Sequence, residues 1–177
     1  MGHRSSQPIG PSLTCGCIKP TMATELTQDM IAGVQVVPLR RIEDERGAVS
    51  LMLKKSDPHF AGFAEIYFSS VYPGVVKAWK KHQRMTVHYA CMLGSVKVVL
   101  WDDRVDSPTR GTIMKEFIGP DDYKLVVIPP NVWHGFQGEG DPVSIVANCA
   151  TEVSDPEELL RMDPRSAAIP FDWDAPG

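Results

Sequence analysis

Short runs of β-branched and aromatic residues, separated by turn residues, fill the chain from Gly33 onward and constrain its fold more than any other feature. Turn signals recur roughly every 8–12 residues, which is typical of an antiparallel barrel or jelly roll. The runs cover residues 34–37, 48–53, 64–70, 75–79, 86–93, 96–101, 112–118, 124–128, 134–137 and 143–147. They do not alternate with helical patterns, so the sequence predicts an all-β fold.

Several turns between these runs have a specific chemistry. Tyr72–Pro73–Gly74 predicts a type II turn, because proline suits its first central position and glycine its second. Gly94 and Ser95 separate two adjacent runs and predict a hairpin. Gly47 closes a charged turn and suits a positive φ.

The N-terminal part differs from this β-rich body. Residues 1–23 are rich in Ser, Pro and Gly and show no periodicity, which predicts a disordered leader, with Met22 as a second candidate for the start. A single domain is expected over 24–177, opening with a short helical turn at 24–31.

A short C-terminal helix is also expected. Ser154 or Asp155 can cap it, and Pro156 suits its first turn. The helix is predicted to end near Met162, and residues 169–173 are predicted to form a final extended piece.

Charge, hydropathy and cysteine usage narrow the class of protein. The formal net charge is −4, and no basic run predicts a nucleic-acid surface. No segment approaches the roughly 18 apolar residues of a membrane span, and no apolar secretory signal opens the chain. Cys91 and Cys149 lie in strand-like runs and are predicted to be buried free thiols, while Cys15 and Cys17 precede the apolar pattern. A reducing, cytoplasmic location is the expectation.

The run at 124–128 ends in two prolines and is followed by a histidine. Pro129 and Pro130 stop the strand, because proline has no backbone donor and fixes φ. His134 begins the next apolar run. A histidine at such a turn tends to point into the mouth of a β-barrel, where small barrels keep ligands. His134 is therefore the first candidate functional residue.

Two further histidines join it as candidates. His82 and His88 lie on successive strand-and-turn segments and could line one cavity with His134. Three histidines from barrel strands can bind a metal ion. The usual small-barrel motif, two histidines one residue apart and then a glutamate, is missing here. A polar cavity without metal is the main prediction, and a metal site is the alternative.

Residues 77–84 carry the densest cluster of charge. In a regular strand Lys77 and Lys80 point to opposite faces, unless a bulge turns Lys80 back inward. One interpretation is an edge strand whose lysines discourage aggregation. The other is a cationic wall for an anionic ligand such as a nucleotide diphosphate, with Arg46 and Arg104 as further members.

The order and spacing of several short motifs carry a family resemblance. The motifs are Asp44–Glu45–Arg46–Gly47, Gly74–Val75–Val76–Lys77, Asp102–Asp103–Arg104 with Ser107–Pro108–Thr109 and Gly111, Ile128–Pro129–Pro130 with His134–Gly135–Phe136, and Asp163–Pro164 with 169–173. Together they resemble the dTDP-4-dehydrorhamnose 3,5-epimerases over a stretch from about Val37 to Trp173. The resemblance implies a cupin-type antiparallel jelly-roll barrel, a homodimer with an exchanged N-terminal strand, and chemistry without metal or cofactor.

The resemblance also implies roles for individual residues. Arg46 would contact the diphosphate of a nucleotide sugar, and Lys77 stands where the family normally has an arginine with the same role. The family's general base, a histidine three residues later, is Lys80 here. Its general acid, a tyrosine thirteen residues after the histidine of the His–Gly–Phe motif, is Ala147 here.

Other family positions differ or persist. The lysine and aspartate that flank the cavity in the family are Val87 and Val98, and a nearby glutamate is Leu51. His134 is retained, and so is Asp163, the usual partner of the base. An altered acid/base set is therefore expected.

The prediction is an epimerase-type enzyme that acts on a nucleoside-diphosphate 4-keto-6-deoxy sugar. Epimerisation beside a ketone needs a base to remove the α-proton and an acid to return one from the opposite face. Lys80 or His82 would be the base, the former only where burial or nearby cations lower its pKa. His134 would polarise the keto oxygen or orient the base. Asp163 would hold the base in position.

Other roles and readings remain open at this point. Tyr67, Tyr89 or Tyr123 could supply the acid in place of Ala147. Substrate binding is assigned to four residues: Arg46, Lys77, His88 and Arg104. One alternative function is a catalytically silent cupin that binds a nucleotide sugar. Another is a metal-dependent cupin built on the three candidate histidines.

Overall fold

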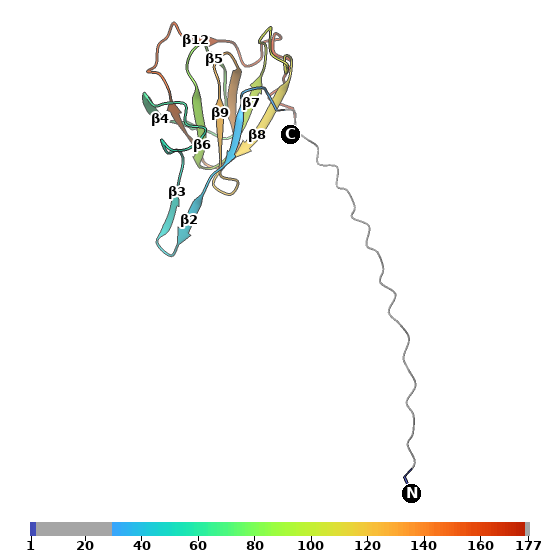
Figure 1. Cartoon of the computed structure of the whole chain (residues 1–177). Helices are drawn as coiled ribbons and strands as arrows, with labels where there is room; N and C mark the ends of the chain where they lie inside the picture. Colours follow the sequence, from blue (N-terminus) through green and yellow to red (C-terminus); the bar gives the residue numbers. More distant parts are fainter. Residues whose placement is uncertain (3–29, 176–177) are drawn as a thin grey trace.

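The computed structural model describes residues 1–2 and 30–175 and contains twelve strands over this range. One five-stranded sheet has the spatial order β1 (Gln35–Pro38), β9 (Lys124–Ile128), β6 (Val87–Leu93), β11 (Ser144–Ala150) and β4 (Glu65–Val71). A second has the order β12 (Leu159–Arg161), β5 (Val76–His82), β10 (Trp133–Gly138), β7 (Val96–Trp101) and β8 (Ile113–Ile118). Figure 1 shows both sheets in one compact barrel.

The inner faces of the two sheets, meaning the faces that look toward each other, share one apolar core. Val87 and Tyr89 from β6 and Val98 and Leu100 from β7 are buried in it. These residues alternate along each strand, because successive side chains of a strand point to opposite faces. The predicted all-β, antiparallel fold is confirmed, and each sheet contributes every second residue of a strand to the interior.

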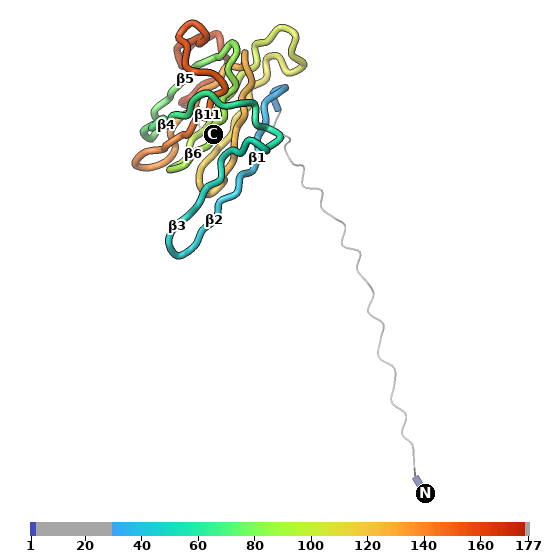
Figure 2. The backbone as a smooth tube through the Cα atoms, turned by 60° about the vertical axis from the view of Figure 1, so that its left-hand side comes forward, coloured from blue at the N-terminus to red at the C-terminus, as the bar shows by residue number. Residues whose placement is uncertain are grey.

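A long hairpin projects from one end of the barrel (Figures 1 and 2). It consists of β2 (Arg41–Asp44) and β3 (Gly47–Ser50), whose residues are almost all exposed. Gly47 has a φ of 135°, as its place in the turn predicted. The first of these strands was missed at the sequence level, because charged residues hide its extended conformation.

The outer faces of the sheets are covered by chain segments without regular structure. On the second sheet, residues 169–173 form no strand but pack by Ile169 and Trp173 against Trp79 and Trp133. On the first sheet, Met52 and Leu53 are among the residues that cover the outer cluster. The barrel thus has an apolar layer outside each sheet as well as inside.

One predicted turn is confirmed, and a predicted hairpin is not. The N–H of Val75 donates to the carbonyl of Tyr72 at 3.1 Å, and Gly74 between them has a φ of 72°, which defines a type II turn. Gly94 has a positive φ of 65°, as a turn requires, but the predicted hairpin is wrong, because β6 and β7 belong to different sheets and do not pair.

The predicted C-terminal helix is wrong: no helix occurs in the part of the chain that the structure describes. Leu159–Arg161 instead forms β12, which pairs with β5. The physical reason is Glu158, whose carboxylate accepts hydrogen bonds from the backbone N–H groups of Arg84 and Met85. Tertiary contacts therefore override the local capping signal. The helical turn expected at 24–31 and the leader lie almost wholly outside the described residues.

Cys91 and Cys149 are buried and free, as predicted, and Cys15 and Cys17 lie outside the described residues. Burial raises the pKa of the Cys91 thiol to about 11. Among the described residues, no helix is long and apolar enough to cross a bilayer.

Candidate functional site

The turn between β9 and β10 carries the two prolines. Pro129 and Pro130 follow the last residue of β9, as predicted. Asn131 then takes a positive φ of 64°, which asparagine tolerates better than most residues, and its N–H donates to the carbonyl of His82 at 2.6 Å. The turn therefore ties the start of β10, which carries His134, to the end of β5.

Two lysines of β5 point into the barrel. In the pairing of β5 with β10, Lys80 lies opposite His134 and Lys77 opposite Phe136, and directly paired residues share a face. Phe136 belongs to the inner core. The register shifts between His134 and Phe136, and this bulge puts two lysines three positions apart on the same face. Because β5 lies between β12 and β10, the edge-strand interpretation is wrong.

His82 and Glu158 form a buried pair at the end of β5. Nδ1 of His82 lies 2.7 Å from Oε2 of Glu158, while Oε1 accepts the N–H groups of Arg84 and Met85. Burial opposes ionisation, but these hydrogen bonds outweigh it and hold the pKa of Glu158 below its usual value. A carboxylate at Nδ1 selects the tautomer with its proton there, so Nε2 of His82 has a free lone pair.

His134 stacks directly on His82, with ring centroids 5.5 Å apart and planes at 17°. Its Nδ1 donates to the carbonyl of Val132 at 3.2 Å, and its Nε2 has no protein partner among the described residues. Burial, with a smaller contribution from the neighbouring His82, lowers the pKa of His134 to about 3. His134 is therefore neutral and packs against His82, which suits the orienting role among those predicted for it.

A cleft opens beside the His82–Glu158 pair. Arg161 of β12 lies opposite Lys80 of β5, and Leu159 lies opposite His82, so these side chains share the inner face. Burial lowers the pKa of Lys80, and the charges of Arg161 and Lys77 lower it further. The cleft has a volume of about 210 Å³ and is lined by His82, Met85, Ser154, Asp155, Pro156, Glu158, Leu159 and Arg161.

A tyrosine of the first sheet faces the same interior. Tyr67 of β4 pairs with Asn148 of β11, which in turn pairs with Tyr89 of the inner core. Nδ2 of Asn148 donates to the hydroxyl of Tyr67 at 2.6 Å. Burial raises the pKa of Tyr67, and this hydrogen bond offsets part of that rise. Because Asn148 is the donor, the hydroxyl proton of Tyr67 stays available to a ligand.

Ala147 lies on the outer face of β11 and not on the inner one. It pairs with Phe68, which is exposed, and with Ala90, which belongs to the outer cluster. The inward position beside it is Asn148, whose partner is Tyr67. The tyrosine hydroxyl in this interior therefore comes from β4.

His88 does not join the other two histidines. It lies on the outer side of β6, where Nδ1 is 2.8 Å from the carbonyl of Cys149 and Nε2 is 3.3 Å from that of His59. The expectation that His82, His88 and His134 line one cavity is therefore wrong, and so is that metal-ligand set. Among the described residues, no group of three or more His, Cys, Asp or Glu side chains could hold a metal ion.

Arg104 is also placed away from the inner cleft, so its predicted role in substrate binding is not supported. Its Nε and Nη2 donate to the carboxylate of Asp102 at 2.8 Å each, and Nη2 donates to the carbonyl of Ala32 at 2.7 Å. Burial would raise the pKa of Asp102, but Arg104 and the hydroxyls of Ser107 and Thr109 hold it well below its usual value. Arg104 anchors the loop after β7 to the segment before β1.

Asp163 lies in the C-terminal segment outside the second sheet. It is exposed, and its Oδ1 accepts the N–H of Arg165 at 2.8 Å. It borders a different cleft of about 360 Å³, together with Val76 and Trp173. The structure does not bring Asp163 to either candidate base. Glu158 is the carboxylate that contacts a histidine in the interior.

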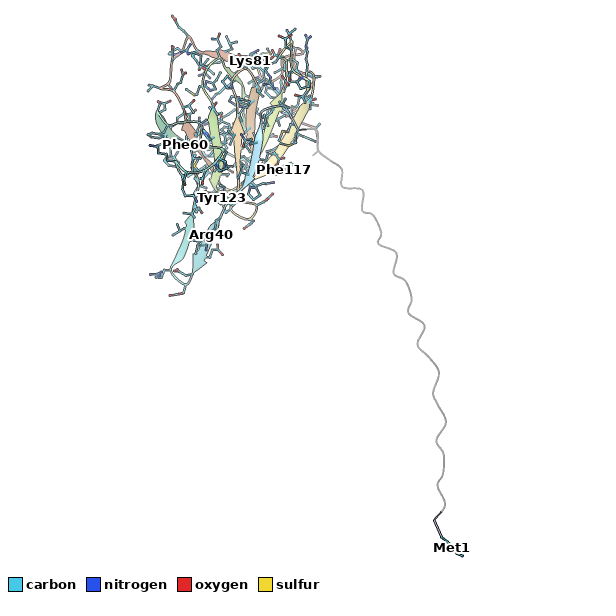
Figure 3. The ribbon with its side chains drawn as sticks, viewed as in Figure 1. Met1, Arg40, Phe60, Lys81, Phe117 and Tyr123 are labelled. Carbon is cyan, nitrogen blue, oxygen red and sulfur yellow. The ribbon has the colours of Figure 1, made fainter. Side chains whose placement is uncertain are left out.

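The two remaining predicted binding residues, Arg46 and Lys77, lie in different parts of the molecule. Arg46 lies at the tip of the projecting hairpin, is 82% exposed and pairs with Asp44, at the opposite end of the molecule from β12 (Figure 1). In Figure 3, Lys81 marks the β12 end and Arg40 the base of the hairpin. Lys77 lies between, where its Nζ donates to Oγ of Ser69 at 3.0 Å and so connects the two sheets.

Three residues of this interior were missed by the sequence. Glu158 lies in a segment whose sequence predicts the start of a helix. Arg161, in the same segment, belongs to no recognised motif. Asn148 stands next to the position that the family resemblance singled out, one residue away from it. A strand assignment for residues 159–161 would have revealed Arg161, because it places this residue beside β5.

Comparison with known proteins identifies the family. A family model described as dTDP-4-dehydrorhamnose 3,5-epimerase matches residues 28–176. The chain belongs to this family. A relative in the family, the probable low-salt glycan biosynthesis epimerase Agl13 of Haloferax volcanii, is 35% identical over 144 residues, which cover 80% of this chain and 89% of the relative.

Solved structures agree with this family membership. The dTDP sugar isomerase of Desulfovibrio desulfuricans has 42% identity and a TM-score of 0.80, covering 83% of this chain and 94% of its own. An epimerase from Legionella pneumophila, solved in complex with dTDP-4-keto-L-rhamnose, has 20% identity and a TM-score of 0.73, covering 83% and 81%, and supports the fold alone. The two-sheet, cupin-type barrel of this epimerase family is thus confirmed.

Proposed function

We propose that the protein is an epimerase that inverts one or both carbons beside the ketone of a nucleoside-diphosphate 4-keto-6-deoxy sugar. Membership of the epimerase family supports this reaction class. The observation that carries the proposal is the placement of two proton-transfer groups. The His82–Glu158 pair on one sheet and Tyr67 on the other face the same interior.

The two groups suit the two halves of the reaction. Nε2 of His82 removes the proton from C3 or C5, the C–H electron pair forms a double bond to C4, and the ketone oxygen becomes an enolate oxyanion. Tyr67 returns a proton to the opposite face of the same carbon, and the enolate becomes a ketone again. The resulting imidazolium and phenolate then exchange their proton through solvent.

His82 is assigned as base in preference to Lys80. A base needs an orienting partner that stabilises its protonated form, and Glu158 holds Nδ1 of His82 at 2.7 Å. The stacked ring of His134 fixes the plane of His82. Lys80 is surrounded by cations, and no carboxylate of the described residues contacts it.

The nucleotide part of the substrate is assigned to cations along β5 and to a second copy of the chain. Lys77 points into the interior and is held by Ser69. Arg46 of the same protomer lies at the far end of the barrel, so its diphosphate contact requires the hairpin of a partner protomer. The proposed active form is therefore a homodimer that exchanges this hairpin.

Deuterium exchange tests the function. Incubation of the protein with dTDP-4-keto-6-deoxyglucose in deuterated water is expected to place deuterium at C3 or C5, read by mass spectrometry and NMR. His82→Gln should slow this exchange by about 10³-fold or more, since a general base contributes roughly 10²–10⁴-fold. His88→Gln is the matched control on the outer face and should keep the exchange rate.

Two results would contradict the proposal. Label at neither carbon, although the nucleotide sugar binds in a calorimetric titration, would favour the alternative of a catalytically silent binding protein. Normal exchange by the His82→Gln variant would remove His82 from the mechanism and leave the base unassigned.

A further inference from the structure

Lys80 and Arg161 form a pair of like charges directly opposite each other on β5 and β12. Like charges in this arrangement destabilise a sheet. Burial makes the charged form of Lys80 costlier still, as the lowered pKa of this lysine shows. The fold thus contains a local arrangement that costs stability.

No carboxylate within the described residues compensates this pair. Every ion pair between described side chains involves other residues. The two carboxylates that line the adjacent cleft are already used, Asp155 by Arg84 at 3.2 Å and Glu158 by His82 at 2.7 Å. Positive charge therefore faces this interior without a protein counter-ion.

Lys80 is half-buried, whereas Arg161 is exposed on the edge strand β12, and two other half-buried lysines of the barrel do have counter-ions. Lys81, the next residue on β5, points to the outer face and lies 2.7 Å from Asp103. Lys124 lies 2.7 Å from Asp122 and 3.2 Å from Glu116. Among the half-buried lysines that the structure describes, those without a carboxylate partner are Lys77 and Lys80, both on the inner face of β5, which indicates an anionic ligand there.

We infer that Lys80 and Arg161 bind the C4 oxyanion of the enolate that forms during epimerisation, as two further catalytic residues. The inference rests on the proposed function and names the groups that stabilise its intermediate. Cations fixed in place before the reaction are effective for this purpose, because they need no reorganisation when the charge develops.

The chemistry of the substrate assigns this oxygen and not the diphosphate to the pair. C4 is bonded to both C3 and C5, so a base that reaches either carbon is next to the C4 oxygen. The diphosphate is attached at C1, on the far side of the sugar ring. Lys80 is two positions from His82 on one face of β5, and Arg161 lines the same cleft as His82. The cations therefore stand where the enolate charge appears.

Other inner residues cannot supply this charge. His134 is neutral, and its Nδ1 is bonded to the carbonyl of Val132. Val87 and Val98 are buried and apolar. Lys77 is held by the hydroxyl of Ser69. Lys80 and Arg161 are the inner-face cations next to the candidate base that no described protein acceptor holds.

Kinetics of the full-length protein test the inference. Arg161→Met and Lys80→Met should each lower kcat for deuterium incorporation by about 10²–10³-fold, the loss typical of one oxyanion-stabilising group, with KM changed by less than about threefold. Arg161→Lys should restore part of kcat, because it keeps the charge. Arg165→Met is the control, since Arg165 is exposed in the outer segment and pairs with Asp174.

The outcomes separate this inference from the proposed function. A raised KM and weaker dTDP binding with unchanged kcat would mean that the cations hold the diphosphate, and would overturn the inference alone. Unchanged kcat in folded Arg161→Met protein, verified by its thermal unfolding, would do the same. Absence of label with the unmutated protein would overturn the proposed function, and the inference with it.

Discussion

The inner and outer sides of the two sheets carry the same residue types, but their polar atoms have different partners on the two sides. On the inner face, His82 keeps Nε2 free while Glu158 holds Nδ1. On the outer face, both ring nitrogens of His88 lie against backbone carbonyls. The identity of a side chain therefore does not decide its role. What decides it is which of its polar atoms the fold leaves unused.

Tyrosines and lysines repeat this contrast. Tyr67 inside accepts a hydrogen bond and keeps its own proton, whereas Tyr123 outside lies against the sulfur of Met92 at 3.4 Å. Lys80 inside has cationic neighbours, whereas Lys81 outside pairs with an aspartate and lies 4.8 Å from the centre of the Trp133 ring. The polar groups of Tyr123 and Lys81 on the outer side contact other side chains of the protein. Those of Tyr67 and Lys80 on the inner side are free to contact a ligand.

The largest expected difference in activity is between variants of Tyr67 and of Tyr123. Tyr67→Phe should lower the rate of epimerisation by about 10²–10⁴-fold, because it removes the acid that returns the proton. Tyr123→Phe should leave the rate unchanged. Both rates can be followed with the nucleotide sugar by NMR. Equal losses in the two variants would erase the distinction between the faces.

The carboxylate behind His82 should matter for both activity and stability. Glu158→Gln removes the buried charge that accepts three hydrogen bonds, and we expect a loss of about 3 kcal/mol in the free energy of unfolding. Glu157→Gln, a change at the exposed neighbour, should stay within about 0.5 kcal/mol. Urea unfolding measures both. A Glu158→Gln variant as stable as the unmutated protein would contradict the structural role of the pair.

Buried His134 predicts a pH dependence of stability. Its pKa is about 3 in the folded protein and near the usual 6.5 when unfolded, so the unfolded chain binds more protons between these values. Stability should thus be complete above pH 6.5 and fall as pH drops toward 3, by up to about 1.4 kcal/mol per pH unit. Measurements between pH 6.5 and 5 avoid the titration of Glu158. His134→Gln should flatten the slope, and a flat profile for the unmutated protein would contradict the prediction.

The smallest effect on stability is expected at the hairpin. Arg46→Ala should change the free energy of unfolding by less than about 0.5 kcal/mol, because its guanidinium is exposed. The same variant should raise KM for the nucleotide sugar if a partner's hairpin delivers this residue. An unchanged KM would show that Arg46 does not contact the substrate and that the barrel alone supplies the binding residues.

Local sequence determined most of the fold. The β-branched runs, the two prolines after Ile128 and the glycine turns at Gly74 and Gly94 act through φ preferences and missing donors, which need no tertiary context. They therefore predicted ten of the strands, and the motif order predicted the family.

The candidate site was decided by pairing between distant strands. A bulge in the pairing with β10 turns Lys80 inward. Glu158, in a segment whose sequence predicts a helix, contacts His82, which is 76 positions away in the chain. Tyr67 and Asn148, 81 positions apart, meet because β4 pairs with β11. Alternation along a strand defines two faces but not which one is inside when both are covered by apolar layers. Only the register across the sheets chose the face, and with it the residues left free for chemistry.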